Sequence, residues 1–469
     1  MQLQRKETTE FLNDLTERDQ RMMYGLVTVV HLAGTKEQLD ADTESLLAVG
    51  RKHLCQLSTL HWQQRDGLDT VLPYGVRRIH ALRTLTTESV AVLMPFKAQE
   101  LNHTNGIYYG QNAVSGNMIR IDRAQLLNGH SFRLGVSGSG KSMSAKEELV
   151  EIALRTKDDI LILDPESEFG QLVKALGGEV LPISPHSSIH LNALDIDRAY
   201  GDGKNPLVDK VKLILSIFEP LTENGLTAKQ RSILDRCARL VYRDYIRGGY
   251  RGAPPTLVDL RRILLEQPEA EAHDLALASE LYTTGSLNIF AHQTNVNTDA
   301  RILCYDIREL DEQLRPVGMV VTLDAIFNRV IRNWRQGKRT WILADEFYIL
   351  FRYSFSAEFF YRLFKRMRKY NAFITAISQN VDEILRSDTA RLMLANSELL
   401  VMLNQAATDR EELAKLLNIS ENQLSYITNV PAGHGLIRCG GAIIPFENSF
   451  PKNTKLYQLM TTKPNEKFE

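Results

Sequence analysis

The sequence predicts an α/β protein with a parallel-rich sheet, an all-helical insertion and a partial N-terminal α+β domain. Two patterns support this prediction. From about residue 113, short apolar runs alternate with helical stretches, which is typical of a parallel sheet covered on both faces. Between about 203 and 292 this alternation stops and only helical periodicity remains. The 469 residues would suffice for roughly two or three domains.

The N-terminal domain is expected to span residues 1–112. The pattern predicts a helix over 8–22, a strand over 24–34 and a long amphipathic helix over 35–57. This region carries no recognisable catalytic constellation, so we expect a packing or docking role for it.

The core domain is expected to span residues 113–450 and to be followed by a polar tail, 451–469. Its strands are predicted from short apolar runs of strand-like composition. These runs are 132–136, 159–164, 179–184, 301–307, 340–345, 372–378 and 398–404. The helical insertion, 203–292, lies between the third run and the fourth.

The loop after the first predicted core strand is a phosphate-binding motif. The sequence GVSGSGKS, from Gly135 to Ser142, matches G-x-x-x-x-G-K-[ST]. The glycines let successive backbone N–H groups curl around phosphates, Lys141 adds a positive charge, and the Ser142 hydroxyl can ligate Mg²⁺. The following helix presents its positive N-terminus to the same anion. The expected nucleotide-binding residues are Gly135, Gly138, Ser139, Gly140, Lys141, Ser142 and Met143.

An acidic pair ends the apolar run at 340–345. In a parallel sheet the carboxyl ends of the strands share one edge, so Asp345 and Glu346 are expected beside the phosphate loop. Asp345 is expected to hold Mg²⁺ together with Ser142, and Glu346 to polarise the attacking water. This arrangement predicts a catalytic nucleotide site.

Two further positions have more than one interpretation. Gln379, at the end of the run 372–378, could sense the terminal phosphate or simply satisfy a strand end. Arg368 lies in a cationic helix end with Lys365, Arg366 and Lys369. That cluster is either a solvated face favourable to the helix dipole or the source of an arginine finger that reaches a neighbouring subunit. For the finger we favour Arg368, with Arg366 as the alternative.

Weaker signals remain elsewhere. Asp164 and Glu166 follow a predicted strand and could support the site or cap a local turn. His186 and His190 lack an acidic or cysteine partner nearby in sequence, which favours a structural role. The four cysteines are scattered, as expected for free thiols in a reducing compartment.

The bulk properties argue for a protein that is soluble or peripheral on a membrane. The net charge is −1, so no overall basic field indicates nucleic acid, although a local basic patch would suffice. No apolar stretch approaches the roughly 18 residues that a membrane-spanning helix needs, and we expect no integral membrane segment.

Together, these segments resemble the type IV secretion and conjugation ATPase family (TraC/TrbE type, conjugative-transposon-like). That family lies within the FtsK/HerA class of RecA-like P-loop motors. The resemblance runs through GVSGSGKSMSAK, ILDPESEFG, ILADEFYILF and FKRMRKYNAFITAISQN. It extends to TTESVAVLMPF, IHLNALDI, GSLNIFAHQTNVN, LVMLNQAATDREELAKLLNIS and GHGLIRCGGAIIPF.

The resemblance implies a hexameric ATPase, using ATP and Mg²⁺, in the cytoplasm at the inner face of the cell membrane. It implies inner-membrane channel components as partners, and DNA or protein as the transferred substrate. By position, it makes Lys141, Ser142, Asp345 and Glu346 the ATP site, Gln379 the sensor and Arg368 or Arg366 the finger. Members of this family are usually longer on the N-terminal side, which implies that this chain begins part-way through their N-terminal domain.

Two other functions compete with an ATPase that energises secretion. One is an ATP-driven DNA translocase or coupling protein of the same motor class. The other is a scaffold that binds nucleotide only to hold its fold, against which Glu346 argues, because a scaffold needs no base to activate water.

Overall fold

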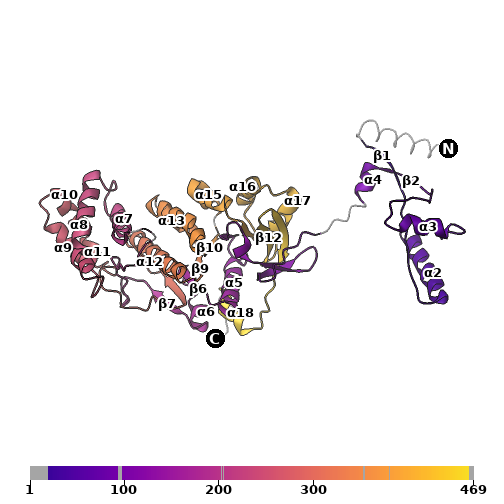
Figure 1. Cartoon of the computed structure of the whole chain (residues 1–469). Helices are drawn as coiled ribbons and strands as arrows, with labels where there is room; N and C mark the ends of the chain where they lie inside the picture. The colour runs from indigo at the N-terminus through magenta and orange to yellow at the C-terminus, as the bar shows by residue number, and fades with distance from the viewer. Residues whose placement is uncertain are drawn as a thin grey trace. The chain divides into compact units, whose positions relative to one another are not determined.

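The computed structural model describes residues 20–92, 98–201, 203, 205–351, 354–379 and 381–463. The chain divides into two compact units, Met1–Lys97 and Ala98–Glu469 (Figure 1). The boundary precedes the expected position after residue 112, because the strand at Ile107–Asn112 pairs within the second unit. Most of the helix predicted over 8–22 lies outside the described residues.

The first unit is small. Its strands β1 (Met22–Gly25) and β2 (Arg83–Thr86) pair antiparallel, and its helices are α2 (Lys36–Lys52), α3 (Gln64–Val71) and α4 (Thr87–Ala91). The strand predicted over 24–34 is wrong beyond Gly25. Its partner β2 has four residues, so pairing ends where Gly25 meets Arg83, and most residues from 26 to 33 are exposed.

The second unit is built on an 11-stranded sheet in the order β4-β3-β13-β12-β11-β5-β10-β9-β6-β8-β7. The strands from β11 to β7 in that order are parallel to one another. They are β5 (Ser131–Leu134), β6 (Asp159–Asp164), β7 (Glu179–Pro182), β8 (Ile302–Asp306), β9 (Thr340–Ala344), β10 (Ala372–Ser378) and β11 (Leu399–Met402). All seven predicted core strands are therefore confirmed in type, as is the α/β fold class.

An antiparallel extension completes the sheet on the β11 side. It consists of β12 (His434–Cys439), β13 (Ala442–Glu447), β3 (Ile107–Asn112) and β4 (Met118–Ile121). This extension joins residues near position 110 to residues near position 446, so it brings the two ends of the second unit together in one sheet.

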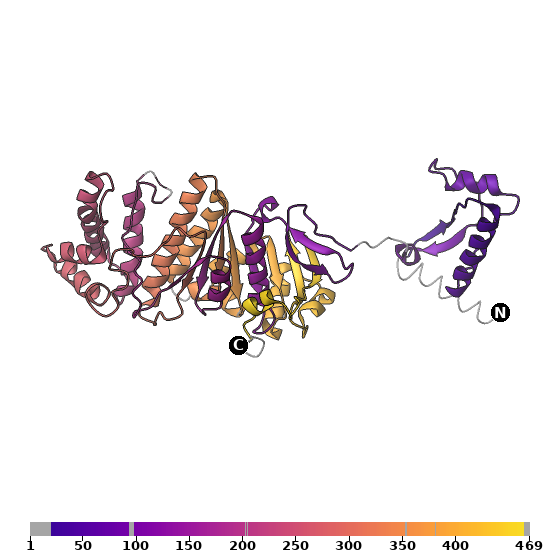
Figure 2. The same cartoon turned by 90° about the horizontal axis from the view of Figure 1, so that it is seen from below.

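Helices cover both faces of the parallel strands (Figure 2). Residues Ile160 and Ile162 of β6 pack with α5 (Lys141–Arg155), α6 (Gly170–Ala175) and α18 (Lys455–Met460). Their neighbours Leu161 and Leu163 belong to the opposite core, because successive strand side chains point to opposite faces. That core includes α12 (Arg315–Arg335), α13 (Ser354–Met367), α14 (Val381–Arg386), α15 (Asp388–Ala395) and α16 (Ala407–Leu417), while the short α17 (Glu421–Leu424) follows α16.

Helices also make up the segment between β7 and β8. They are α7 (Pro206–Phe218), α8 (Ala228–Arg247), α9 (Leu257–Leu265), α10 (Ala270–Ala278) and α11 (Glu280–Thr283). Thr227 and Gln230 form a capping box that starts α8, and Asn205 caps α7 with Pro206 as its first residue. In Figures 1 and 2, α8 to α11 gather at one end of this unit, beyond α7 and α12.

The C-terminal residues pack on the core as far as they are described. The sequence suggested a polar tail from 451, but residues 455–460 form α18, whose Leu456, Leu459 and Met460 join the apolar core beneath α5 and α6. The Lys146 ammonium of α5 donates to the Met460 carbonyl at 3.0 Å. In the described part of the chain, no helix is both long enough and apolar enough to cross a bilayer.

Candidate functional site

Three adjacent parallel strands place the predicted site residues at one edge of the sheet. β5, which leads into the phosphate loop, pairs with β10, and β10 pairs with β9. Their carboxyl ends lie in register, with Ser378 opposite Leu134 and Ala376 opposite Ala344. The residues that follow these ends therefore converge, although the phosphate loop lies more than 200 positions before Asp345 and Gln379 in sequence.

The phosphate loop has the backbone that its glycines predict. Gly138 and Gly140 have φ of 76° and 102°, in the region that residues with a Cβ rarely adopt. Gly140 is the N-cap of α5, so the free N–H groups of the first helical turn open into the loop. The Lys141 ammonium donates to the Val136 carbonyl at 3.0 Å, which folds its side chain back over the loop.

Carboxylates crowd around Lys141, which is 7 % exposed. Burial lowers the pKa of Lys141, while Glu346, Asp345 and Glu168 act in the opposite direction. Burial raises the pKa of Asp345 to about 8, and the negative charges of Glu168 and Glu346 add to this rise. The cluster therefore has more carboxylates than cationic side chains. A divalent cation bound there would reduce the repulsion between the carboxylates.

Glu346 occupies an unusual backbone position. Its φ is 42°, and its N–H donates to the Asp345 carboxylate at 3.0 Å. The Gln379 amide donates to its Oε1. Burial raises the pKa of Glu346 to about 7, although Lys141 and the Gln379 hydrogen bond lower it. A left-handed backbone at a residue with a side chain stores strain, and such strain concentrates at functional sites.

The residues present fit a nucleotide with Mg²⁺. Among the described residues, the Ser139 Oγ and the Glu346 Oε2 are buried and have no hydrogen-bond partner in the protein. Glu346 lines a cavity of about 470 Å³ together with Lys141, Ser142, Asp345 and Gln379. A buried polar atom without a partner is costly, so the Glu346 Oε2 indicates a place for a polar group of a ligand.

The sequence missed several residues of this cavity. Glu168 lies in the turn after β6 and acts electrostatically on Lys141, Asp345 and Glu346. It belongs to the acidic segment DPESEFG, which was the available signal. Glu147 of α5 and Asn448 after β13 also line the cavity, and the Asn448 amide donates to Glu147. Asn448 comes from the far end of the chain, and no local pattern indicated it.

The residues with weaker sequence signals, Asp164, Glu166 and His190, have different roles in the structure. The Asp164 carboxylate accepts the N–H groups of Glu168 and Phe169 at 3.0 and 2.9 Å, which is the capping arrangement of a turn. Glu166 is exposed and lines the nucleotide cavity. His190 bonds to the Ile289 carbonyl at 3.3 Å and thus joins the loop after β7 to the segment after α11.

Arg368 does not join the other predicted site residues. It lies just before Ala372, at the amino end of β10, whereas Gln379 follows the carboxyl end of the same strand. Seven residues of strand separate them, which corresponds to about 20 Å. Arg368 and Arg366 are both exposed at the opposite edge of the sheet. Arg368 therefore cannot act on a nucleotide held by its own chain.

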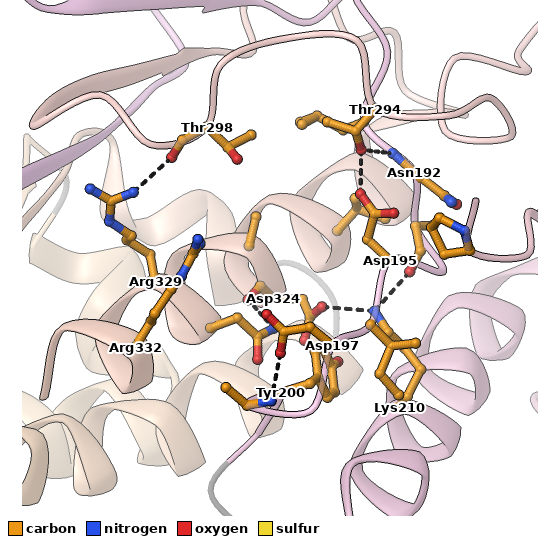
Figure 3. Close-up of a pocket in the computed structure, with 18 of the residues that line it drawn as sticks. Asn192, Asp195, Asp197, Tyr200, Lys210, Thr294, Thr298, Asp324, Arg329 and Arg332 are labelled. Carbon is orange, nitrogen blue, oxygen red and sulfur yellow. Dashed lines mark hydrogen bonds and ion pairs between the residues drawn. The ribbon is translucent and has the colours of Figure 1, made fainter. Parts of the chain in front are cut away.

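A second cavity, of about 370 Å³, lies where the helical insertion meets α12 (Figure 3). The Lys210 ammonium of α7 donates to the Asp324 carboxylate of α12 at 3.2 Å, and the Tyr200 hydroxyl donates to the same carboxylate at 2.7 Å. Nearby, the Thr294 hydroxyl donates to Asp195. Since these polar groups bind one another, we interpret this cavity as a joint between the insertion and the sheet.

Residues 282–434 match the family model of the TraG P-loop domain, and residues 107–246 match that of the central domain of the helicase HerA. A search of curated proteins found no match.

Among solved structures, VirB4 of Thermoanaerobacter pseudethanolicus aligns with a TM-score of 0.67 at 23 % identity, over 76 % of this chain and 99 % of that chain. The conjugative coupling protein TrwBdeltaN70 aligns with a TM-score of 0.47 at 16 % identity, over 74 % of this chain and 90 % of that one. TrwB in complex with ADP and Mg²⁺ aligns with a TM-score of 0.48 at 16 % identity, over 79 % and 94 %.

The VirB4 likeness shows that this chain and that structure share a fold. The two family models confirm the resemblance to conjugation proteins and HerA-class motors over the residues that they match.

Proposed function

We propose that this chain, a RecA-like P-loop NTPase, hydrolyses ATP to energise a conjugative type IV secretion channel, either its assembly or the passage of substrate through it. The observation that carries the proposal is the convergence of Lys141, Asp345, Glu346 and Gln379 on one cavity at the carboxyl edge of the sheet. Together they supply a phosphate cradle, a metal ligand, a base and a residue that orients the base.

Each side chain has a distinct task in this proposal. Lys141 and the N–H groups at the start of α5 bind the phosphates. Ser142 and Asp345 hold Mg²⁺, which when bound neutralises charge on the phosphate oxygens. Glu346 accepts a proton from the attacking water, and the Gln379 amide at its Oε1 orients the carboxylate for that transfer.

The carboxylates explain why hydrolysis fits better than simple binding. Glu346 is held in a strained backbone conformation against Asp345, with a pKa of about 7. A base with its pKa near the operating pH is well suited to proton transfer. A nucleotide that served only to stabilise the fold would not require this arrangement.

The setting in the cell also belongs to the proposal. By the resemblance, the chain acts as a homo-hexamer in the cytoplasm, against inner-membrane components of the channel, and moves DNA or protein. The name of the VirB4 structure and the TraG P-loop match support this setting. The match to the HerA helicase domain keeps a DNA translocase as the second candidate.

Steady-state ATP turnover, with and without single- and double-stranded DNA, tests both candidates. The secretion ATPase predicts Mg²⁺-dependent turnover that DNA changes by less than about twofold, whereas a translocase that tracks DNA predicts strong stimulation that salt weakens. Negative-stain images with a non-hydrolysable ATP analogue should show rings. Absence of ATP turnover from well-folded rings would contradict the proposal.

A further inference from the structure

The nucleotide cavity has a second wall that the phosphate chemistry does not use. Besides the phosphate loop, its lining includes Phe446, Asn448, Phe450, Tyr457 and Thr461. These residues come from β13, the loop after it, α18 and the residue that follows α18. A nucleotide has a planar base and a ribose as well as a phosphate chain, so a wall at this place can meet the base.

Hydrogen bonds fix this wall against the phosphate loop. The Gly433 N–H donates to the Ser139 carbonyl at 3.0 Å, and the Asn448 N–H donates to the Gly433 carbonyl at 2.8 Å. Gly433 has a φ of 83°, and a Cβ there would lie 2.3 Å from the Asn448 carbonyl oxygen. Lys146 of α5 holds the Met460 carbonyl from the other side, at 3.0 Å. The fold therefore sets the distance between the wall and the phosphates.

Two aromatic rings belong to this wall and contact each other. The rings of Phe450 and Tyr457 are nearly parallel, with 22° between their planes and 6.5 Å between their centroids. Both side chains are half-buried and line the cavity, so part of each ring faces it. Phe446, also in the lining, is buried at 2 % exposure. Nucleic-acid bases stack on such rings, and the attraction tolerates different bases because every base has a π-face.

Polar side chains line the same cavity as the rings. The Asn448 amide donates to the Glu147 carboxylate, and burial raises the pKa of Glu147 to about 7 although that hydrogen bond lowers it. Glu147 follows Lys141 by about 1.7 helical turns on α5, and both side chains line the same cavity. These two side chains offer hydrogen bonds to the edge of a base or to a ribose hydroxyl, groups that a bare phosphate chain lacks.

We propose that residues 446–463 form the base-binding wall of the nucleotide site, with a purine base stacked on Phe450 and Tyr457 and with Asn448 and Glu147 at its polar edge. This inference rests on the proposed function, because it needs a nucleotide on the phosphate loop. The aromatic contact distinguishes a nucleotide from an inorganic phosphate chain, which binds through the loop alone.

Calorimetric binding of Mg²⁺-ATP and of Mg²⁺-tripolyphosphate to the full chain tests the proposal. Tyr457→Ala and Phe450→Ala should each weaken ATP binding about tenfold or more, because a base loses a stacking partner. The affinity for tripolyphosphate should change by less than about twofold, because this ligand has no base to stack on the rings. Tyr457→Phe, which keeps the ring, should behave as wild type, and Phe450→Leu, which keeps apolar volume, should behave as Phe450→Ala. Tyr426→Ala, 38 % exposed and outside the cavity lining, is the matched control.

Every result bears on the proposal. Unchanged ATP affinity in both alanine variants would overturn it, because the base would lie elsewhere. An equal loss for ATP and tripolyphosphate would also overturn it, because the segment would then act by holding the phosphate loop. If the wild type binds ATP but no tripolyphosphate, the ATP affinities of Tyr457→Phe and Tyr457→Ala are compared. A loss in Tyr457→Ala alone would support stacking on the ring, and equal affinities would overturn it. Lys141→Ala serves as the separate check on the proposed function: it should weaken both ligands, and failure to do so would count against the phosphate site itself.

Discussion

Lys141 lies among three carboxylates, those of Glu168, Asp345 and Glu346, each of which raises its pKa against the effect of burial. A triphosphate would bring further negative charge to this place. The lysine alone cannot neutralise it, which explains why the site pairs a lysine with two groups that suit Mg²⁺, Ser142 and Asp345. At the scale of residues, the site is an acidic pocket in which a bound divalent cation would offset part of the negative charge of the carboxylates and of a triphosphate.

Replacement of Lys141 tests this balance. Lys141→Ala should weaken Mg²⁺-ATP binding on the order of 10–100-fold, because a charge-assisted hydrogen bond to phosphate is lost. Turnover should fall with it, while the melting temperature stays close to that of the wild type. Lys157→Ala removes an exposed lysine just beyond the same helix and is the control. Wild-type turnover in a folded Lys141→Ala protein would refute the phosphate-loop assignment.

The sequence predicted the site residues that belong to local motifs, and it missed those that reach the site through contacts between distant segments. The loop from Gly135 to Ser142, and Asp345 and Glu346, were predictable because each follows an apolar strand and parallel strand ends share an edge. Glu168 could be named only as part of an acidic turn, since its contact with the cluster depends on the path of that turn. Asn448 was out of reach, because β13 brings it to the site through pairing between distant segments.

At the scale of elements, a buried ionic network ties the phosphate-loop helix to the sheet. Glu148 of α5 binds Arg133 of β5 at 2.9 Å and Arg123 at 3.0 Å, and it accepts the Thr375 hydroxyl of β10 at 2.9 Å. Both guanidinium groups and the carboxylate are at most 1 % exposed. The network therefore joins the strand before the phosphate loop, the helix after it and the strand that leads to Gln379.

Removal of the Glu148 charge should lower the stability of the fold. Glu148→Gln leaves two buried guanidinium groups without a countercharge, and it should lower the free energy of unfolding by about 3–5 kcal/mol. Glu151→Gln, which removes one partner of an exposed pair with Arg155 on the same helix, should cost about 0.5 kcal/mol or less. Urea unfolding of the two variants measures the difference, and equal small effects would contradict the buried network.

The same carboxylate predicts a dependence of stability on pH. Burial raises the pKa of Glu148, but Arg133 and Arg123 outweigh it and lower the pKa from 4.5 to about 2. Because the folded pKa lies below the unfolded one, the stabilisation is fully present above pH 4.5 and is lost as the pH falls towards 2. The gap in unfolding free energy between wild type and Glu148→Gln should therefore narrow across this window. A constant gap would show that the carboxylate does not carry the effect.

The sequence predicted the strands of the sheet best where both of their faces are buried. The seven parallel strands are buried on both faces and read as continuous apolar runs. The strand prediction over 24–34 was wrong beyond Gly25, because the partner strand β2 is too short to pair with the residues that follow. Helix α18 was missed because six residues with three core contacts are too short for periodicity to show.

At the scale of the whole molecule, the position of Arg368 has a direct consequence. It is exposed at the amino edge of the sheet, while the nucleotide cavity lies at the carboxyl edge. If Arg368 contributes to hydrolysis, it must do so at the nucleotide of a neighbouring subunit. An arginine finger of this kind is worth roughly 10³–10⁵ in rate.

Mixed rings test that role. Lys141→Ala subunits lack the phosphate site but keep their arginine, and Arg368→Ala subunits have the reverse defect. Each variant alone should be nearly inactive, with Arg368→Ala still binding ATP, and mixing them should restore part of the turnover. Arg366→Ala provides the alternative finger in the same assay. Where subunits demonstrably exchange, no recovery on mixing would exclude a role for Arg368 across the interface.

Glu346→Gln tests most directly whether Glu346 activates water for ATP hydrolysis. The amide keeps the shape and can still accept the Gln379 hydrogen bond, but it cannot take a proton. We predict that Mg²⁺-ATP binds to this variant with wild-type affinity while turnover falls by on the order of 10²–10⁴. Glu309→Gln, on the exposed loop after β8, should leave both quantities unchanged. Turnover in Glu346→Gln within a few-fold of the wild type would contradict the account.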